Sequence, residues 1–498
     1  MKKRLAILLT LALSITGVLP AAAAAEETED KVIIGVTNVI DKVDPTYGGD
    51  PWSLTADGIS ETIFMQNAEG ELVSHIAEDL EQVDDLTWKL TLKDGVKFSD
   101  GSDVDAAAVA ESMNTVMEMN PNATDSAGKI TFEAAEDGTV TLTTERKTTV
   151  MKSILCEWAN IVFKGSEEEG YVFTGPYMLE SLDPGVSVNL VPNEYYDEHA
   201  AERPDVQLLC FKDTTAMQQA FESGEIDMAF TVTNEIAEDL ENKGLTVKNF
   251  DAGYQYFAIP NLAKAPLDDP NVVKAISELI DRDAMQTVLR GGRTATGLFA
   301  TYYSFAGEFE AKTDAEDAAA LLEAAGYADT DGDGYLDKDG ETLELQLLTY
   351  SYRPDLPVLM QLTASALDAA GIKVTTSIVD NIDEVLGAGE FDIAFYAQHT
   401  APTGEPAYAL NMFFRTDGSK NHNGYSNAEV DSLLDQMGEM EVGEERDGLA
   451  KQVQQIAGEE GAMIYLIDPE WHIAVSDKLA DYEPYCGDYY VVNPELGL

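Results

Sequence analysis

The sequence predicts an α/β fold with mostly parallel sheets. The first observation is that short apolar or alternating segments take turns with amphipathic helical segments through both halves of the chain. The second is the length of 498 residues, which suits two or three domains of roughly 150 residues each. The third is the absence of any internal repeat or low-complexity linker, so a boundary between domains should be short and structured.

The first half of the chain is expected to contribute four strands and two helices. Each predicted strand is a short apolar or period-two run with turn residues nearby, and each predicted helix is Ala-rich or has a polar cap. The predicted strands are residues 31–39, 88–92, 139–144 and 226–232. The predicted helices are residues 105–119 and residues 214–223, the second with a threonine cap and Gly224 as its stop.

The second half continues the alternation with longer amphipathic helices. Here apolar residues recur at helical spacing, and glycines such as Gly371 follow the last helical turn. The predicted helices are residues 271–289, 314–325, 358–370, 428–440 and 446–458. The predicted strands are residues 341–350, 372–379 and 463–467.

The charge balance excludes several classes of partner. Asp and Glu number 91 against 31 Lys and Arg, which gives a formal net charge of −60. A nucleic acid is excluded as a natural partner because neutralising phosphates requires clustered cations. Adsorption to an anionic membrane surface is disfavoured for the same reason. The hydrophobic fraction of 45% indicates a folded chain with an acidic surface.

The first residues have the pattern of a secretory signal peptide. Basic residues at 2–4 precede an apolar run at 5–19, and small residues follow at 21–25. The run is short for a membrane anchor, which is the alternative. We therefore expect residues 1–25 to be a signal peptide and the remainder to be secreted to the periplasm or the cell exterior. No lipobox cysteine stands near the cleavage site, so a lipid has no acceptor there.

The three cysteines match no zinc or redox motif. Cys156 and Cys210 lie in apolar strings, and Cys486 is near the C-terminus. An odd count permits one disulfide at most, and we expect buried thiols.

No short motif of catalysis is present. HExxH, CxxC and GxSxG are absent, and the five histidines lack metal-ligand spacing. The glycine-containing loop 292–297 continues with Leu298 and Phe299 where a phosphate loop needs Lys and Ser or Thr. These absences argue against an enzyme and give no sign of a cofactor. A secreted acidic hydrolase remains the alternative from another class.

One acidic loop resembles part of a calcium site. Asp329, Asp331 and Asp333 stand at its first, third and fifth positions, but the twelfth position is Gly340 instead of Glu. A strand is predicted after the loop, where a calcium hand has a helix. We favour a polar turn over a calcium site, and predict no metal centre elsewhere.

Six segments in order resemble the family 5 extracellular solute-binding proteins of ABC transporters, the peptide- and nickel-binding group. The first contains the string DGVKFSDG within residues 76–110, and the second runs from TGPY to NEYY. The segments are residues 76–110, 174–196, 220–229, 265–284, 318–345 and 424–431. The resemblance extends from about residue 31 to the C-terminus.

The resemblance implies a two-lobed periplasmic-binding-protein-like fold of the class II type. Lobe I would span residues 26–260 and contain an extra subdomain at about 50–165. Lobe II would span residues 261–475, and residues 476–498 would return to lobe I. Closure of the lobes would enclose a small solute, and the protein would deliver it to a membrane permease without chemistry. We expect a monomer. A solute receptor without transport is the other alternative.

The loop after residue 398 bears on the solute. In peptide-binding relatives an Asp of this loop pairs with the peptide amine, and here that place is Pro402. In nickel-binding relatives a His follows the Asp-Pro step, and here that place is Ala407. A bound peptide therefore should not depend strongly on a free amino terminus. His399 and Glu405 remain candidate ligand contacts, and a peptide, a related small solute or a metal chelate all stay open.

Four further residues are candidate ligand contacts. Arg353 follows a predicted strand at its carboxyl end, where a cation in so acidic a protein could clamp a ligand carboxylate. An ion pair with another acid of the chain is the alternative. Trp52 could stack on a ligand or pack in the core. Tyr47 and Tyr396 are weaker candidates of the same kind.

Overall fold

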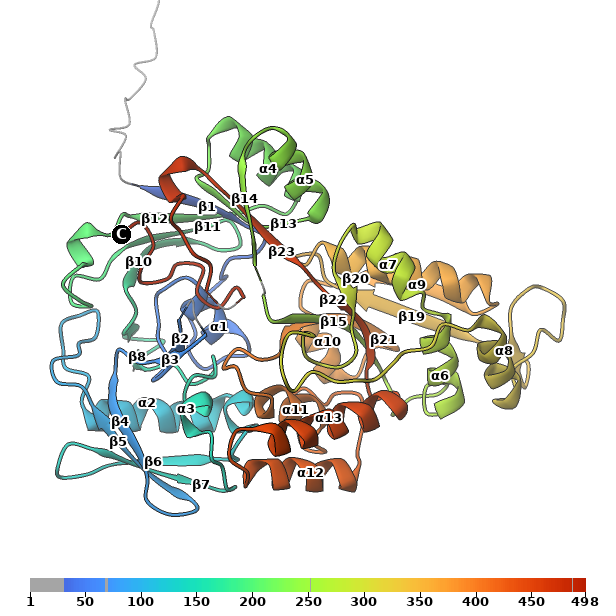
Figure 1. The fold of residues 1–498 in the computed structure, drawn as a ribbon, viewed down its shortest axis with the longest axis horizontal. Helices are drawn as coiled ribbons and strands as arrows, with labels where there is room; N and C mark the ends of the chain where they lie inside the picture. Colours follow the sequence, from blue (N-terminus) through green and yellow to red (C-terminus); the bar gives the residue numbers. More distant parts are fainter. Residues whose placement is uncertain (1–30, 68–69, 251, 486) are drawn as a thin grey trace, which may run out of the picture.

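The computed structural model describes residues 31–67, 70–250, 252–485 and 487–498. The predicted signal peptide at residues 1–25 and Cys486 lie outside the described residues. The described chain forms two lobes, each built on one large sheet, and a smaller subdomain at the lower left of Figure 1. The predicted two-lobed α/β class is confirmed.

Lobe I is built on a seven-stranded mixed sheet. In spatial order its strands are β10 (Tyr177–Asp183), β11 (Ser187–Pro192), β12 (Val206–Cys210), β1 (Val32–Val36), β13 (Met228–Val232), β23 (Trp471–Val475) and β14 (Thr246–Phe250). Only β1 runs parallel to its neighbours, β12 and β13. The other pairs are antiparallel, because β10 and β11 form a hairpin and β23 returns from the far end of the chain.

Helices cover the lobe I sheet and bury its apolar residues. Helices α4 (Thr214–Ser223) and α5 (Asn234–Asn242) pack on β13 and β23, and α1 (Asp50–Ala56) follows β1. Met217, Phe221 and Leu240 belong to the core cluster beneath α4 and α5. Burial of such side chains contributes about 1.5–3 kcal/mol each. The 3₁₀ turns of this lobe are Ala200–Glu202 and Asp477–Leu479.

Lobe II is built on a six-stranded mixed sheet. In spatial order its strands are β16 (Arg293–Thr294), β22 (Ile464–Asp468), β15 (Tyr254–Pro260), β21 (Ile393–His399), β19 (Glu344–Thr349) and β20 (Lys373–Ile378). β19 is parallel to β20 and β21, whereas the pairs of β15 with β21 and β22 are antiparallel. The prediction of mostly parallel sheets is therefore wrong for both lobes.

The helices of lobe II fall into two groups. Those around the sheet are α6 (Pro270–Leu279), α7 (Arg282–Leu289), α8 (Ala315–Ala324), α9 (Asp355–Ala369) and α10 (Ile382–Ala388). A lower group extends toward the subdomain at the bottom of Figure 1, namely α11 (Ala407–Phe414), α12 (Ala428–Gly438) and α13 (Glu444–Glu459). A short hairpin of β17 (Asp337–Lys338) and β18 (Glu341–Thr342) follows α8.

The inserted subdomain, defined here as residues 65–173, lies between α1 and β10 in the chain. Its four-stranded antiparallel sheet has the order β4 (Ala77–Gln82), β5 (Thr87–Leu92), β7 (Val140–Thr144) and β6 (Ile130–Ala134). Helix α2 (Ala106–Met119) packs on β6 and β7. Smaller elements complete it: β2 (Met65–Gln66), β3 (Leu72–Val73), the 3₁₀ turn Pro121–Thr124, α3 (Met151–Ile154), β8 (Phe163–Ser166) and β9 (Gly170–Phe173).

The chain passes between the two large sheets twice. β14 lies in the lobe I sheet and β15 in the lobe II sheet, so the first passage falls between residues 250 and 254. The second falls between β22 and β23. The boundaries expected from the sequence, 260/261 and 475/476, fall at the C-terminal ends of β15 and β23. Each expected boundary thus lies one strand after a passage between sheets.

Local details differ from the sequence prediction in two places. The single helix predicted over residues 271–289 is two helices, because Asp281 caps the start of α7 by accepting the amide of Ala284 at 2.9 Å. The cap of α4 is Asp213, whose carboxylate accepts the amide of Thr215 at 2.8 Å, and not a threonine. Gly224 ends α4 with a φ of 76°, as the sequence predicts.

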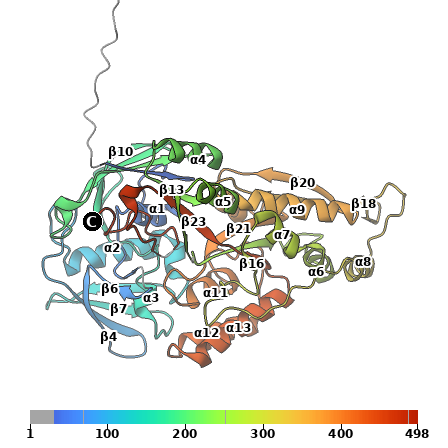
Figure 2. The same cartoon turned by 45° about the horizontal axis from the view of Figure 1, so that its top comes forward.

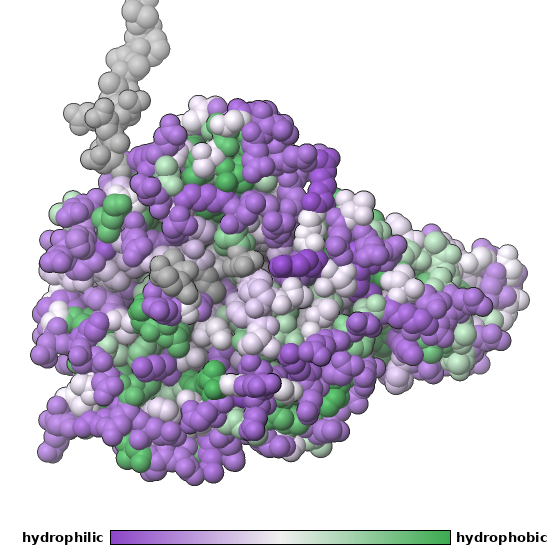
Figure 3. All heavy atoms as spheres, in the orientation of Figure 1, coloured by the Kyte–Doolittle hydropathy of each residue, from purple (hydrophilic) through white to green (hydrophobic). Residues whose placement is uncertain are grey.

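The surface and the cysteines are largely as the sequence predicts. Among the described residues, none of the helices is both long and apolar enough to cross a membrane. The face shown in Figure 3 is mainly hydrophilic, with scattered apolar patches, as expected for an acidic surface. Cys156 is a buried thiol, as predicted, whereas Cys210 is only half-buried.

Candidate functional site

A cavity lies between the lobes where parallel strands end. Its lobe I wall comes from the residues after β1, from α1 and from β13, and Arg353 after β19 closes it from lobe II. The lining residues include Asn38, Trp52, Asp57, Thr231, Arg353 and Asp488. Ligands of open α/β sheets bind at such carboxyl ends. The cavity volume is about 40 Å³, too small for a peptide or chelate, so a solute can enter only when the lobes separate.

Arg353 is buried at the centre of the contact between lobes. Its Nη2 donates to the carboxylate of Asp488 and to the Tyr254 hydroxyl, the latter at 2.9 Å. Its guanidinium also lies 4.7 Å from the ring centroid of Tyr254 and 5.0 Å from that of Trp471. Burial lowers the pKa of Arg353, but the charge of Asp488 and the neighbouring tyrosines together outweigh it, and the net shift is upward. Arg353 is therefore a fixed cation in the cavity wall.

Three polar atoms around this cavity are buried without a hydrogen-bond partner. They are Arg353 Nε, Trp52 Nε1 and Asp57 Oδ2. Burial raises the pKa of Asp57 to about 8. Buried polar groups are normally paired, and each exception requires an explanation. A group with both a donor and an acceptor, entering this cavity, would satisfy these atoms.

The backbone of the cavity wall is strained at Thr231. Its φ is 62°, a left-handed value that is unfavourable for a β-branched residue. The pairing of β13 with β23 shifts register between Phe230 and Val232, which marks a bulge at this position. Strained backbone of this kind costs about 1–3 kcal/mol and clusters at binding sites.

His399 lies beside this cavity in an aromatic cluster. It ends β21, is fully buried, and its ring centroid is 5.4 Å from Tyr254 and 4.9 Å from Tyr489. Burial, followed by the charge of Arg353, lowers the pKa of His399 to about 3, so the imidazole is neutral. Gly487 leaves room for the ring, because a Cβ there would lie 2.4 Å from His399 Cδ2.

The other residues singled out from the sequence lie elsewhere. Tyr47 is 53% exposed, with Lys42 Nζ 3.8 Å from its ring centroid. Tyr396 is in the lobe II core and donates to Asp383 at 2.8 Å. Glu405 pairs with Arg446 and accepts the amide of Ala407 at 2.8 Å, which fixes the start of α11. Only Trp52 and Arg353 line the cavity together, with His399 behind them.

The three carboxylates of the calcium-like loop do come together. Their ligand atoms lie within 4.8 Å of one another, and all three residues are exposed. Each also accepts backbone amides, for example Asp329 from Gly332 at 2.7 Å and Asp333 from Tyr335 at 2.8 Å. These bonds account for the turn without an ion.

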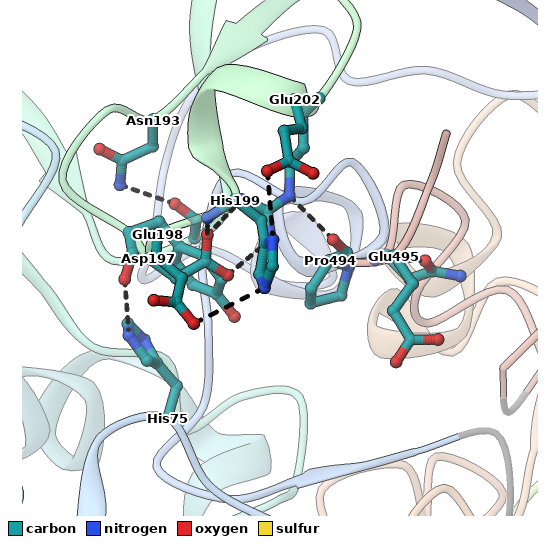
Figure 4. Close-up of polar contacts among 12 residues, drawn as sticks. His75, Asn193, Asp197, Glu198, His199, Glu202, Pro494 and Glu495 are labelled. Carbon is teal, nitrogen blue, oxygen red and sulfur yellow. Dashed lines mark hydrogen bonds and ion pairs between the residues drawn. The ribbon is translucent and has the colours of Figure 1, made fainter. Parts of the chain in front are cut away.

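Two residues of the cavity wall, Asp57 and Asp488, were not among the candidates found from the sequence. Asp488 contacts Arg353 across 135 positions of the chain. The segment that carries it is fastened to lobe I further along, where Arg203 Nε donates to the Pro494 carbonyl at 2.8 Å. Figure 4 shows this region, with Pro494 beside the segment of Asp197 and His199. Arg203 is itself held by Asp197 through two bonds of 2.7 Å.

A half-buried histidine of the inserted subdomain contacts the same region. His75 Nδ1 lies 3.1 Å from Glu61, and its Nε2 lies 3.0 Å from the Tyr196 carbonyl (Figure 4 labels His75). Burial lowers the pKa of His75, but the hydrogen bond and charge of Glu61 outweigh it, and the net shift is upward. This network fixes how the subdomain meets lobe I.

The chain is similar to proteins of one known family. The family model of the bacterial extracellular solute-binding proteins, family 5 Middle, matches residues 71–421. The glutathione-binding protein GsiB of Salmonella paratyphi A is 27% identical over 495 residues, which cover 93% of each chain. The nickel-binding protein NikA of Staphylococcus aureus is 22% identical over 444 residues, which cover 88% of each chain.

Solved structures agree with this placement. NikA of Staphylococcus aureus, in complex with Ni(L-His)2, superposes with a TM-score of 0.84 at 21% identity, over 94% of this chain and 99% of that one. The oligopeptide-binding protein AppA of Bacillus subtilis, in complex with a nonapeptide, gives 0.82 at 19% identity, over 94% and 98%. The family resemblance predicted from the sequence is thereby confirmed, and the chain belongs to the family 5 extracellular solute-binding proteins.

Proposed function

We propose that this protein captures a small zwitterionic solute outside the cytoplasmic membrane by closure of its lobes, and delivers it to the permease of an ABC importer. One observation carries the choice of solute. Asp57 from lobe I and Arg353 from lobe II line one cavity, and each has a buried polar atom without a partner. A solute with an amine and a carboxylate would meet both.

The solutes of the relatives fit this description. NikA is described in complex with Ni(L-His)2, GsiB as glutathione-binding and AppA in complex with a nonapeptide. Histidine, glutathione and peptides each contain an amine and a carboxylate. Amino acids, short peptides and their metal chelates are therefore the class we propose here. The protein acts as a monomer that changes shape, because one chain supplies both walls of the cavity.

The position of Asp57 changes the expectation about the solute's amine. Pro402 removes the carboxylate that peptide-binding relatives place in the lobe II loop, which suggested that blocked amines would be accepted equally. Asp57 offers a carboxyl group from the opposite lobe, at the end of α1. We therefore propose that the amine anchor lies in lobe I in this protein, and that a free amine improves binding.

The experiment begins with mass spectrometry of the solute released from the denatured protein. Calorimetry then compares this solute with forms that are acetylated at the amine or amidated at the carboxyl group. Each blocked form should bind about tenfold or more weakly, because it leaves a buried group unpaired. Equal binding of all three forms would contradict the proposal.

Two variants separate the roles of the cavity walls. Arg353→Ala should weaken binding by about 2–5 kcal/mol, because a carboxylate loses its partner inside the contact between lobes. The same change also strands Asp488, so Arg353→Ala combined with Asp488→Asn serves as the matched control for folding. Affinity within about a factor of two of the wild type in both variants would exclude Arg353 from the site.

A further inference from the structure

A second cavity lies between the inserted subdomain and the lower helices of lobe II. We call it the basic cavity. One wall is formed by the segment from β7 to α3, and the other by α11, α12 and α13, which lie beside that segment in Figures 1 and 2. Its volume is about 230 Å³, against about 40 Å³ for the cavity between the sheets. The two cavities share no lining residue.

The charge of the basic cavity is opposite to that of the protein. Four of its lining residues are cations, namely Arg146, Lys147, Arg415 and Arg446, in a chain with only 31 Lys and Arg and a net charge of −60. Two carboxylates, Asp435 and Glu439, also line it. Cations clustered in this way in a protein with 91 acidic side chains indicate a site for an anion.

Most of these cations already have an ion pair. Arg446 pairs with Glu405, and Arg415 pairs with Asp435 at 2.9 Å. Lys147 lies 3.1 Å from Asp85 and 3.7 Å from Glu439. These pairs leave Arg146 as the exception.

Arg146 has no carboxylate within 4.0 Å among the described residues. Its Nη2 donates only to the backbone carbonyls of Thr124, at 3.0 Å, and Asp125, and its Nε is buried without a hydrogen-bond partner. Burial and then the charge of Arg415 lower the pKa of Arg146, although Asp417, Asp125 and Asp435 act in the opposite sense. The neighbouring guanidinium thus destabilises Arg146, and no anion in direct contact offsets this.

We propose that the basic cavity binds a small organic carboxylate. Its head would lie between Arg146 and Arg415, since a planar guanidinium matches a carboxylate with two parallel hydrogen bonds. Its apolar part would lie against Val150, Ile154 and Leu434, which line the same space. A single negative charge suits the site, because only one cation lacks an ion pair.

The position of the cavity gives such a ligand a role. Arg146 belongs to the inserted subdomain and Arg415 to lobe II, so a bound carboxylate joins the two. Ser419 already makes a contact of this kind, since its hydroxyl donates to Asp125 at 2.6 Å. Opening of the lobes would divide the site, so the carboxylate should favour the closed form. By linkage it should raise the affinity for the principal solute, which is the solute proposed for the cavity between the lobes.

The test uses butyrate and the purified protein without its principal solute. Melting temperature is measured against butyrate concentration at constant ionic strength, with chloride as the balancing anion. A ligand that binds only the folded state raises the melting temperature in a saturable way. Arg146→Gln should weaken the apparent affinity about tenfold or more. Arg290→Gln, at an exposed arginine paired with Glu235 and Glu238, is the matched control and should respond like the wild type.

Other outcomes decide against the proposal. An equal rise for wild type and Arg146→Gln, or no saturable rise in the wild type, would overturn the site. A response to phosphate equal to that for butyrate would overturn its assignment to organic carboxylates. If Arg146→Gln does not fold, the NMR signal of carboxyl-labelled butyrate is measured instead in the presence of the wild type and of Arg146→Lys. Lines that stay sharp with the wild type would count against binding. The proposal for the interlobe cavity does not depend on any of these results, because the two cavities share no lining residue.

Discussion

Replacing Asp57 by Asn should stabilise the protein and weaken solute binding at the same time. Asp57 is 7% exposed, and one carboxylate oxygen has no hydrogen-bond partner. Its pKa is raised from 3.8 to about 8. A residue whose native surroundings oppose its charged form destabilises the folded state. A destabilising carboxyl group in the wall of a cavity indicates a role in ligand binding.

The expected change in the free energy of unfolding follows from the pKa of Asp57. Because the folded pKa is above the unfolded value, the folded state binds the proton more tightly, and stability falls as pH rises from about 4 to about 8. At pH 7 the carboxyl group of the unfolded chain is ionised, because the pH is about three units above its pKa. At about 1.36 kcal/mol per unit, this difference destabilises the folded state by about 4 kcal/mol. The unpaired amide of Asn costs about 1–3 kcal/mol. We expect a net gain of about 1–3 kcal/mol for Asp57→Asn.

The assay is urea unfolding between pH 5 and pH 9, together with calorimetry of the solute at pH 7. Asp57→Asn should show a flatter dependence of stability on pH than the wild type, and weaker binding of solutes with a free amine. Asp41→Asn, which removes an exposed charge on the same segment, should change neither. A variant that is less stable than the wild type at pH 8 and binds the solute normally would refute the reasoning.

Four further outcomes are expected. Affinity for an amine-bearing solute should rise up to about tenfold per pH unit between pH 6 and pH 8, as the Asp57 carboxyl more readily releases its proton, and calorimetry of Asp57→Asn should show no such rise. Small-angle scattering should show a smaller radius of gyration with solute than without, and an unchanged radius would count against hinge closure. EDTA should leave the melting temperature unaltered, whereas a drop that calcium restores would place an ion at Asp329, Asp331 and Asp333. The raised pKa of His75 means that its pairing with Glu61 stabilises the fold below about pH 6.5 and is lost as pH rises through the folded pKa, so His75→Gln should cost more melting temperature at pH 5.5 than at pH 8.5.

Local signals in the sequence predicted local structure well. Gly224 ends α4 at the residue expected, because a left-handed C-terminal position is a property of the chain alone. The predicted helix over 271–289 merged α6 and α7, since the apolar spacing continues through Asp281 and only the cap bond distinguishes the break.

The candidate site was harder to predict because its contacts are remote in sequence. Arg353 and Trp52 were found from their places after predicted strands, and both line the cavity. Asp488 has no local pattern, and its pairing with Arg353 depends on how the C-terminal segment crosses the lobes. Tyr396 looked like a ligand contact, but β21 is buried along its whole length, so its aromatic side chains serve the lobe II core.

The return of β23 to the lobe I sheet has a consequence for the order of folding. β23 lies between β13 and β14, so this sheet has an interior gap until residue 475 has been synthesised. All six strands of the lobe II sheet fall within residues 254–468 and can pair earlier. Pairing across so many residues is slow, because the ends of a long loop must first meet. A nascent chain that stops at residue 468 should therefore protect lobe II from protease while lobe I stays open to cleavage, which makes the N-terminal lobe the last to fold.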